Sequence, residues 1–266
     1  MRFLLSRRWI LFALAVAIAA WGAVQLGDWQ FRRLHERHHS NGVIGRNLAA
    51  LPVPAQDVLS AEHAPSANDE WRKVTVRGTW DGKHTIVLKY QTRDEGAGVD
   101  VVTPLVTSTG TAVLVDRGWM SSDNSGQKRP ELPATTSGTV TVTGYVRRDA
   151  TGGSTRVSDL ATRAVSSRTI ADAVPYPLFQ GFLDLVAESP RAETKLGAVE
   201  LPDHTGDGPH FFYGLQWWFF GVLAVFGFCY LAFDEFRRRR QERAAAASEG
   251  ARHAAVDRQH RPAHEG

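Results

Sequence analysis

The residues with the greatest chemical potential lie at the start of the second of two apolar segments. There, His210 is followed by Tyr213, Gln216 and Trp217. At about 100° per residue, one helix face contains His210, Tyr213, Gly214 and Trp217. Gly214 is small and lets a neighbouring helix or a flat ligand approach closely. Because polar groups at membrane depth are costly, they usually have a function, and a histidine here can coordinate a haem iron. The competing interpretation is an aromatic belt at the membrane surface, packed on another helix.

A second cluster follows the first apolar segment and contains Trp29, Gln30 and Arg33. We expect it to lie at the same membrane boundary as His210. Arginine at such a rim pairs with carboxylates, for example haem propionates. The alternative is a set of snorkelling arginines beside an interfacial tryptophan, with no ligand at all.

A third pattern, His-Glu-x-x-His, is formed by His35, Glu36 and His39. Two histidines one helical turn apart and a glutamate base are what a zinc metallopeptidase needs. The same residues also suit an exposed, strongly polar helix beside a membrane. The sequence has no nucleophile elbow, Walker loop or dinucleotide fingerprint. Its single cysteine, Cys229, excludes an intrachain disulfide.

Two apolar segments long enough to span a bilayer organise the chain. The net charge is only +3, and the basic residues gather at the two ends, which favours membrane topology over nucleic-acid binding. Basic residues flank the outer ends of both segments, so both termini are predicted to be cytoplasmic. Small residues in the first segment also suit a signal-peptide cleavage site. The predicted organisation is a cytoplasmic N-terminus (1–8), a first span (9–26), an extracytoplasmic β-rich domain (27–210), a second span (211–233) and a disordered basic tail (234–266).

Short alternating apolar segments predict strands within the extracytoplasmic domain, after a linker at 40–68. These segments are 73–80, 85–90, 99–102, 112–117, 139–146 and 182–186. No helical run of sufficient length separates them, so we expect an antiparallel β-barrel or β-sandwich-like domain rather than a parallel βαβ sheet. Arg117, Gly118 and Trp119 end one strand, and the simplest interpretation is a tight turn whose tryptophan caps the core.

Four short motifs resemble those of the Surfeit-locus-one family of cytochrome c oxidase assembly factors, in the order that the family has them. The motifs are Gly27-Asp28-Trp29-Gln30-Phe31-Arg32-Arg33, then Val99-Asp100-Val101-Val102-Thr103-Pro104-Leu105, then Arg117-Gly118-Trp119, and finally His210 with Tyr213, Gln216 and Trp217. The resemblance covers about residues 9–235. It implies two membrane spans around a β-rich extracytoplasmic domain.

The resemblance also implies a function. A bacterial member of this family would be a non-enzymatic chaperone of the cell membrane that binds haem a transiently. It would assist delivery of haem a to the catalytic subunit of the oxidase, at the outer face of the membrane. His210 would be the axial ligand to the haem iron. The residues implied around it are Trp29, Gln30, Arg33, Tyr213, Gln216, Trp217, Arg117, Gly118 and Trp119. No catalytic residue is expected.

The implied partners are the oxidase subunits, chiefly the haem-bearing one, together with the lipid bilayer and haem a synthase. Nucleic acid is not expected as a partner. An alternative within the same family is a scaffold that binds oxidase subunits and no haem.

Overall fold

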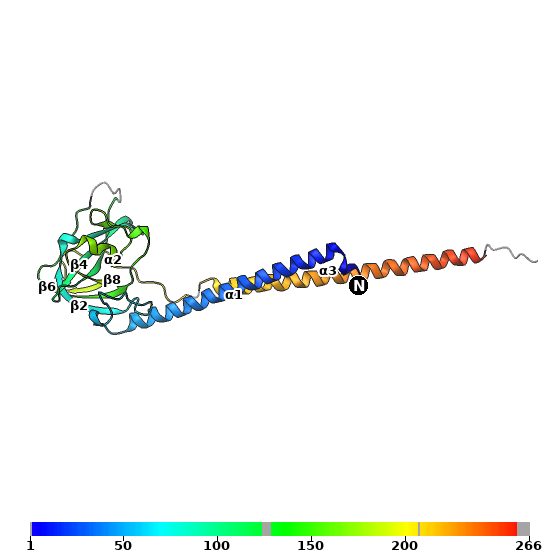
Figure 1. Ribbon diagram of the computed structural model, residues 1–266, viewed down its shortest axis with the longest axis horizontal. Coiled ribbons are helices and arrows are strands. Elements are labelled where there is room, and N and C mark those ends of the chain that lie inside the picture. Colours follow the sequence, from blue (N-terminus) through cyan, green and yellow to red (C-terminus); the bar gives the residue numbers. More distant parts are fainter. Residues whose placement is uncertain (1, 124–128, 207, 260–266) are drawn as a thin grey trace, which may run out of the picture. The chain divides into compact units, whose positions relative to one another are not determined.

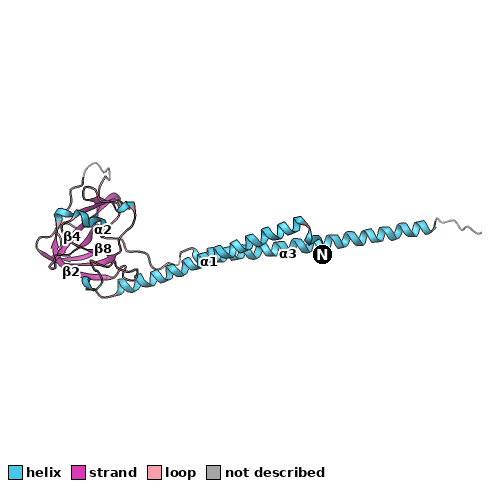
Figure 2. Ribbon diagram, in the orientation of Figure 1, coloured by secondary structure: helices cyan, strands magenta, loops and turns pink. Residues whose placement is uncertain are grey.

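A computed structural model describes residues 2–123, 129–206 and 208–259, without the side chains of Arg2, Phe3 and 251–259. The chain forms two compact units. One unit contains the two ends of the chain, Met1–His38 and Asp207–Gly266, and the other contains the residues between them, His39–Gly206. Figure 1 shows the path of the chain by residue number, and Figure 2 shows its helices and strands.

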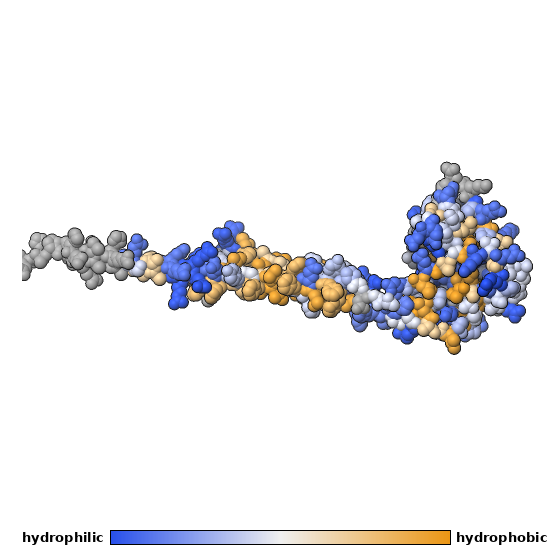
Figure 3. Space-filling model, turned by 180° about the vertical axis from the view of Figure 1, so that it is seen from behind, coloured by the Kyte–Doolittle hydropathy of each residue, from blue (hydrophilic) through white to orange (hydrophobic). Residues whose placement is uncertain are grey.

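The first unit is built on two long helices that lie side by side, α1 (Arg7–Ala49) and α3 (His210–Gln259), after a short turn η1 (Arg2–Leu5). Residues 39–49 of α1 belong to the second unit. Their apolar windows have mean hydropathies of 2.1 and 1.7, yet only 11% and 6% of these windows are buried. Apolar helices that a soluble core would cover are mostly buried, so these two are long, apolar and exposed enough to suit a bilayer. Figure 3 shows the apolar band on the paired helices.

Both helices extend beyond the predicted spans. α1 continues through residues 40–49, where the sequence predicted the start of a linker. α3 continues as a helix to Gln259 in place of the predicted disordered tail, whose residues 260–266 lie outside the described part. Alanine, arginine and glutamate are strong helix formers. Ion pairs one turn apart add to this, with Arg238 at 2.8 Å from Asp234 and Arg239 at 2.7 Å from Glu235.

The second unit contains one sheet of eight strands among the residues that the structure describes. The strands are β1 (Val53–Pro54), β2 (Lys73–Trp80), β3 (Ile86–Arg93), β4 (Gly96–Thr107), β5 (Ala112–Ser121), β6 (Thr139–Arg147), β7 (Ala161–Thr162) and β8 (Leu178–Ser189). Short helical turns connect them: η2 (Ala55–Asp57), η3 (Gly82–His84), η4 (Gly153–Thr155), α2 (Ser167–Ile170) and η5 (Ala171–Ala173). The six predicted strand segments coincide with strands, except that Thr85 precedes β3, because their alternating apolar residues face the core.

The prediction of an antiparallel β-barrel or β-sandwich-like domain between two apolar helices is confirmed for the helices and the β-rich domain, but the antiparallel barrel is wrong. The sheet is mixed and is not a barrel, with the order β1-β2-β6-β8-β5-β4-β3-β7 and an additional short pairing of β2 with β4. Three pairs are parallel: β1–β2, β3–β7 and β5–β8. No βαβ unit is needed for the β5–β8 pair, because these strands are not consecutive and β6 lies between them in the sequence. The parallel pairing of two strands that are far apart in the sequence, such as β5 and β8, has no local sequence pattern.

The core of this unit lies on both faces of the central strands. In β5, the residues from Ala112 to Trp119 are all buried. One apolar cluster includes Leu105 and Leu183, and a second includes Leu114 and Ile170 of α2. A strand covered on both faces is apolar along its length rather than alternating. The charged residues inside β5 therefore have few ways to reach water.

Three aspartates are buried on adjacent central strands: Asp100 on β4, Asp116 on β5 and Asp184 on β8. Asp116 and Asp184 are direct neighbours in the β5–β8 register. Arg93 donates a hydrogen bond to Asp100 over 3.0 Å, and Arg147 donates one to Asp184 over 2.6 Å.

The pKa values of all three carboxyl groups are raised, chiefly because burial disfavours their charged forms. Repulsion between the carboxylates adds to this effect. Burial raises the pKa of Asp100 to about 6, although Arg93 opposes the shift. Burial and the two neighbouring carboxylates raise the pKa of Asp116 well above its usual range. The pKa of Asp184 is also raised by burial, against the attraction of Arg147.

These shifts predict that the β unit loses stability as the pH rises toward neutrality. The pKa of Asp100 is about 6 in the folded protein, against 3.8 for the ordinary group. Between these two pH values, Asp100 is protonated in the folded protein and ionised in the unfolded chain. The corresponding free energy is at most about 3 kcal/mol, and it is lost as the pH rises through 6. We expect the unfolding temperature to fall more steeply between pH 4.5 and 7.5 in the wild type than in Asp100→Asn. Asp172→Asn, which changes an exposed aspartate, is the control. Equal slopes in the wild type and Asp100→Asn would contradict the prediction.

Candidate functional site

The structure brings His210 and Gln30 together. His210 is the first residue of α3, and its Nδ1 lies 2.8 Å from Oε1 of Gln30 on α1. The two residues are 180 positions apart in the sequence, and Gln30 is only 9% exposed. The sequence expectation that the two clusters meet is thus met by these two side chains.

This hydrogen bond determines which nitrogen of His210 is free. An amide oxygen only accepts hydrogen bonds, so Nδ1 of His210 carries the hydrogen and donates it to Gln30. In the neutral ring, Nε2 then holds a lone pair. Histidines that bind metals ordinarily donate their second ring N–H to an oxygen in this way, because the bond fixes the ring and makes the ligand nitrogen more basic. The bond to Gln30 thus holds the ring of His210 through Nδ1 and leaves Nε2 as the nitrogen that does not contact Gln30.

Reciprocal packing between glycines and aromatic rings holds the two helices in register. Gly214 on α3 faces Phe31, whose ring would lie 2.8 Å from a Cβ atom built on the glycine. Gly27 on α1 faces the ring of Trp218, which would collide with such an atom. The rings of Phe31 and Trp218 are in contact, with centroids 4.8 Å apart. Gly214 thus serves helix packing, and the space beside it is filled by a side chain rather than open to a flat ligand.

Trp29 and Arg33 lie together on an exposed part of α1. The guanidinium of Arg33 lies 5.9 Å from the centroid of the Trp29 ring, and it forms an ion pair with Glu36 over 3.1 Å. An exposed ion pair of this kind contributes little free energy and exchanges easily. Arg33 can therefore release Glu36 for another carboxylate at small cost.

The remaining predicted residues of α3 lie on the first turns after His210. Tyr213 is 48% exposed and Gln216 is also exposed, whereas Trp217 is half-buried and contacts Phe220 edge to face. In a bilayer these side chains would lie at the polar boundary of the apolar band. The helix pair thus offers a fixed histidine beside an exposed aromatic surface.

A shallow hollow of about 560 Å³ lies on the same helix pair, among Asp28, Phe31, Arg32, His35, Glu36 and Trp218. His35 and Glu36 of the His-Glu-x-x-His pattern line it, whereas His39 does not. In the part of the chain that the structure describes, no group of three or more metal-binding side chains lies close enough to hold an ion. The geometry therefore gives the zinc peptidase hypothesis no support.

The Arg-Gly-Trp motif lies in the β unit and has structural roles there. Gly118 has φ = +122°, and its N–H donates to Asp116 over 2.9 Å, at a β-bulge where β5 has one extra residue against β4. A side chain at Gly118 would collide with the carbonyl of Gly197. The indole N–H of Trp119 donates to the carbonyl of Gln91 over 2.8 Å. The motif needs glycine because only glycine adopts this backbone conformation beside another chain segment.

Sequence reasoning missed two sets of residues. The first is the aromatic pair Phe31 and Trp218, whose partner glycines are recognisable only when the two helices are paired. The second is the group of buried aspartates described above. A signal for it was present, because each aspartate interrupts an otherwise apolar strand, as in Leu183-Asp184-Leu185.

Comparison with known proteins identifies the family of the chain. The sequence profile of the SURF1 family matches residues 17–222 of the chain. The chain belongs to the SURF1 family. It is also similar to uncharacterized SURF1-like proteins of Mycobacterium bovis and of two strains of Mycobacterium tuberculosis. Each is 29% identical over 250 residues, which cover 92% of this chain and 90% of the relative.

Membership confirms the resemblance seen in the motifs. SURF1 proteins are generally oxidase assembly factors rather than enzymes, and the matched region of this chain includes both His210 and Gln30. The mycobacterial relatives are themselves uncharacterized. Involvement in the assembly of a cytochrome c oxidase follows from the family, whereas the cargo and the individual partners do not.

The glycine packing predicts a specific sensitivity to substitution. In Gly27→Leu, the new side chain would meet the Trp218 ring and force the helices apart, at a cost of roughly 1–3 kcal/mol. Gly22→Leu on the same helix is the control, since nothing lies within 4 Å of a Cβ atom there. Thermal unfolding of the full-length protein in non-ionic detergent would measure both. A loss of stability in the control as large as in Gly27→Leu would contradict this role for Gly27.

Proposed function

We propose that this SURF1 protein holds haem a through His210 and presents it to the catalytic subunit of a cytochrome c oxidase at the outer face of the membrane. Haem a is the cargo in this proposal, and the protein changes none of its bonds. The observation that carries the proposal is the hydrogen bond from Nδ1 of His210 to Gln30, which leaves Nε2 free to bind iron.

The surroundings of His210 suit an amphipathic macrocycle. The apolar band of α1 and α3 offers a lipid-like environment to the ring, and Trp29, Tyr213 and Trp217 offer aromatic surfaces at its polar edge. Arg33 supplies a cation for a propionate, because its exposed pair with Glu36 is easily exchanged. Gln216, exposed on the same turns, adds a hydrogen-bonding amide. A single histidine ligand with an exposed surround favours release, as a carrier requires.

The proposed topology has both termini in the cytoplasm and the β unit outside it, in the cell membrane. Arginines cluster just after the apolar part of α3, as Arg237, Arg238, Arg239 and Arg240. Arg7 and Arg8 begin α1. Basic residues next to membrane spans are retained on the cytoplasmic side. In this topology His210, at the other end of the apolar part of α3, lies at the opposite face.

A scaffold that binds oxidase subunits without haem is the second candidate. It is favoured by the large number of exposed aromatic residues on α3, such as Phe212 at 73% and Phe226 at 67% exposure. Aromatic residues are enriched in the interfaces between proteins. In this version the catalytic subunit of the oxidase, with haem a synthase beside it, would contact α3 directly.

The visible spectrum of the protein distinguishes the two candidates. The full-length chain, purified from cells that synthesise haem a, should show a haem spectrum, and His210→Ala should lose it. Gln30→Leu should retain the ligand but weaken binding roughly 10–100-fold, because Nδ1 loses its acceptor. His35→Ala, which changes another histidine of the same helix pair, should leave the spectrum unchanged.

Two results would count against the haem proposal. An unaltered spectrum in His210→Ala would remove His210 as the ligand. A wild-type protein without haem, but with an oxidase subunit that copurifies, would favour the scaffold.

The topology is tested with reporter fusions. Alkaline phosphatase, which folds only outside the cytoplasm, should be active when fused near residue 120 and inactive when fused after residue 240. Green fluorescent protein at the same positions should give the reverse pattern. Activity of the phosphatase fusion after residue 240 would refute the cytoplasmic C-terminus.

A further inference from the structure

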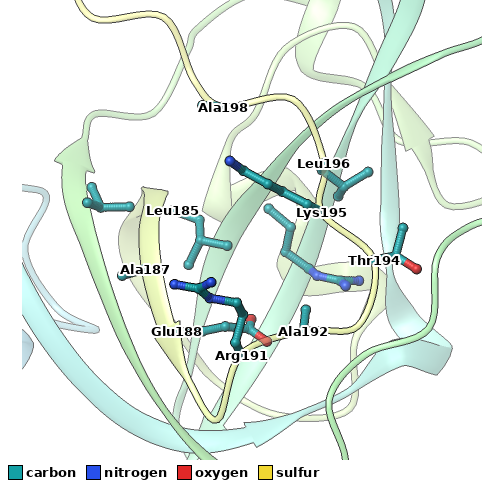
Figure 4. Close-up of a pocket in the computed structure, with 11 residues that line it drawn as sticks. Leu185, Ala187, Glu188, Arg191, Ala192, Thr194, Lys195, Leu196 and Ala198 are labelled. Atoms are coloured by element: carbon teal, nitrogen blue, oxygen red, sulfur yellow. The ribbon is translucent and has the colours of Figure 1, made fainter.

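The β unit contains a cavity of about 310 Å³ that the proposed haem function does not use. It lies between β8 and the segment that follows it, residues 191–198. This segment pairs with β5 through Gly197 and Trp119. The basic residues that line the cavity are Arg117, Arg191 and Lys195, and the apolar residues are Leu185, Val186, Ala187, Ala192, Leu196 and Ala198. Figure 4 shows Arg191 and Lys195 extending across the hollow from this segment. The volume is at the lower end of the range for small-molecule sites.

Arg117 is a buried cation without a carboxylate partner. Its residue is 6% exposed, and two of its N–H groups donate to the backbone carbonyls of Pro133 and Ala134, over 3.2 and 2.9 Å. Within the described part of the chain, no carboxylate lies at ion-pair distance from it. Burial consequently lowers the pKa of Arg117, and Glu188 opposes the shift from a longer distance. A buried guanidinium with unused N–H groups is stabilised when an anion binds beside it.

Arg191 and Lys195 add two more cations at the mouth of the cavity. Both are exposed, and neither forms an ion pair or hydrogen bond with the residues that the structure describes. Arg93 and Arg147, by contrast, are each matched to a carboxylate in the same unit. The three cations around this cavity therefore lack the carboxylate partners that Arg93 and Arg147 have.

One acidic residue, Glu188, also lines the cavity, and half of its carboxylate is unsatisfied. Its Oε1 accepts a hydrogen bond of 2.5 Å from the hydroxyl of Thr136, while Oε2 is buried and has no partner among the described residues. A buried oxygen of this kind costs free energy unless a donor reaches it. The charge of the lining is nevertheless positive, with three cations against one carboxylate.

We propose that this cavity is a binding site for a small amphipathic carboxylate, with the carboxylate beside Arg117, Arg191 and Lys195 and an aliphatic chain against Leu185 and Leu196. The cations account for the charge of the ligand, and the leucines and alanines account for its apolar part. Inorganic oxyanions would match the cations but leave the apolar wall uncovered. The site lies within the β unit and is independent of His210.

Titration with hexanoate tests the proposal on the full-length protein in non-ionic detergent. Isothermal calorimetry should show binding of hexanoate at a single site, and weaker binding of acetate, because each methylene group buried against the leucines raises the affinity roughly fourfold. Hexanamide, which has nearly the same shape and no charge, should not bind measurably. Sodium sulfate should compete poorly with hexanoate.

Charge-neutral variants locate the site. Arg191→Gln combined with Lys195→Gln should weaken hexanoate binding roughly tenfold or more, since each removes a charged partner. The matched control is Arg77→Gln with Lys83→Gln, which removes two cations from exposed positions outside the cavity lining. The control should bind hexanoate as the wild type does. Arg117 is left intact, because its hydrogen bonds also support the fold.

A variant that binds hexanoate more tightly than the wild type gives an independent test, because a misfolded variant would bind it more weakly. Glu188→Gln removes the one negative charge from the lining and keeps an acceptor for Thr136. It should tighten hexanoate binding a few-fold. Three results would overturn the proposal: equal binding of hexanoate by the wild type and the Arg191/Lys195 double variant, sulfate binding that excludes hexanoate, or equal affinities for acetate and hexanoate. None of these results would bear on haem binding by His210.

Discussion

A glycine on each long helix faces an aromatic ring on the other, and this reciprocal packing determines how the two helices align. Gly27 receives Trp218, and Gly214 receives Phe31. Sliding either helix along its partner would drive a ring into a backbone that has no room for it. Because Gln30 precedes Phe31 directly, the same alignment places its amide oxygen opposite His210. The orientation of the imidazole thus depends on packing that is itself purely apolar.

The β unit treats its buried charges in two different ways. Asp100 and Asp184 have arginine partners on neighbouring strands, and Asp116 accepts the N–H of Gly118. These groups are satisfied inside the protein, although burial keeps their carboxyl groups close to protonation. Arg117 donates to two backbone carbonyls and lies over the ring of Trp80, and no carboxylate lies within ion-pair distance of it among the described residues. Asp116 and Arg117 are neighbours on β5 and differ in this respect. The charge of Asp116 serves the fold, whereas the charge of Arg117 is available to a ligand.

The sequence predicted the strands well and the sheet poorly. Alternation along Lys73–Trp80 reproduces β2 because side-chain period and burial are local properties. The parallel pairing of β5 with β8 could not be predicted, since it joins strands that are more than fifty residues apart and has no signature in either. His210 was identifiable as an unusual polar residue in an apolar segment. Its contact with Gln30 was expected only because both clusters were predicted to lie at the same membrane boundary. The roles of Phe31 and Trp218 depend on which glycine lies opposite, which neither helix reveals by itself.

The position of β8 has a consequence for how the protein is made. This strand lies between β6 and β5 in the sheet, although it is the last strand in the sequence. While the polypeptide is still being synthesised, β5 and β6 each have an open edge that only Leu178–Ser189 can fill. The sheet therefore cannot be completed until nearly all of the unit has been made. During that interval, the unpaired strand edges are open to pairing with other chains.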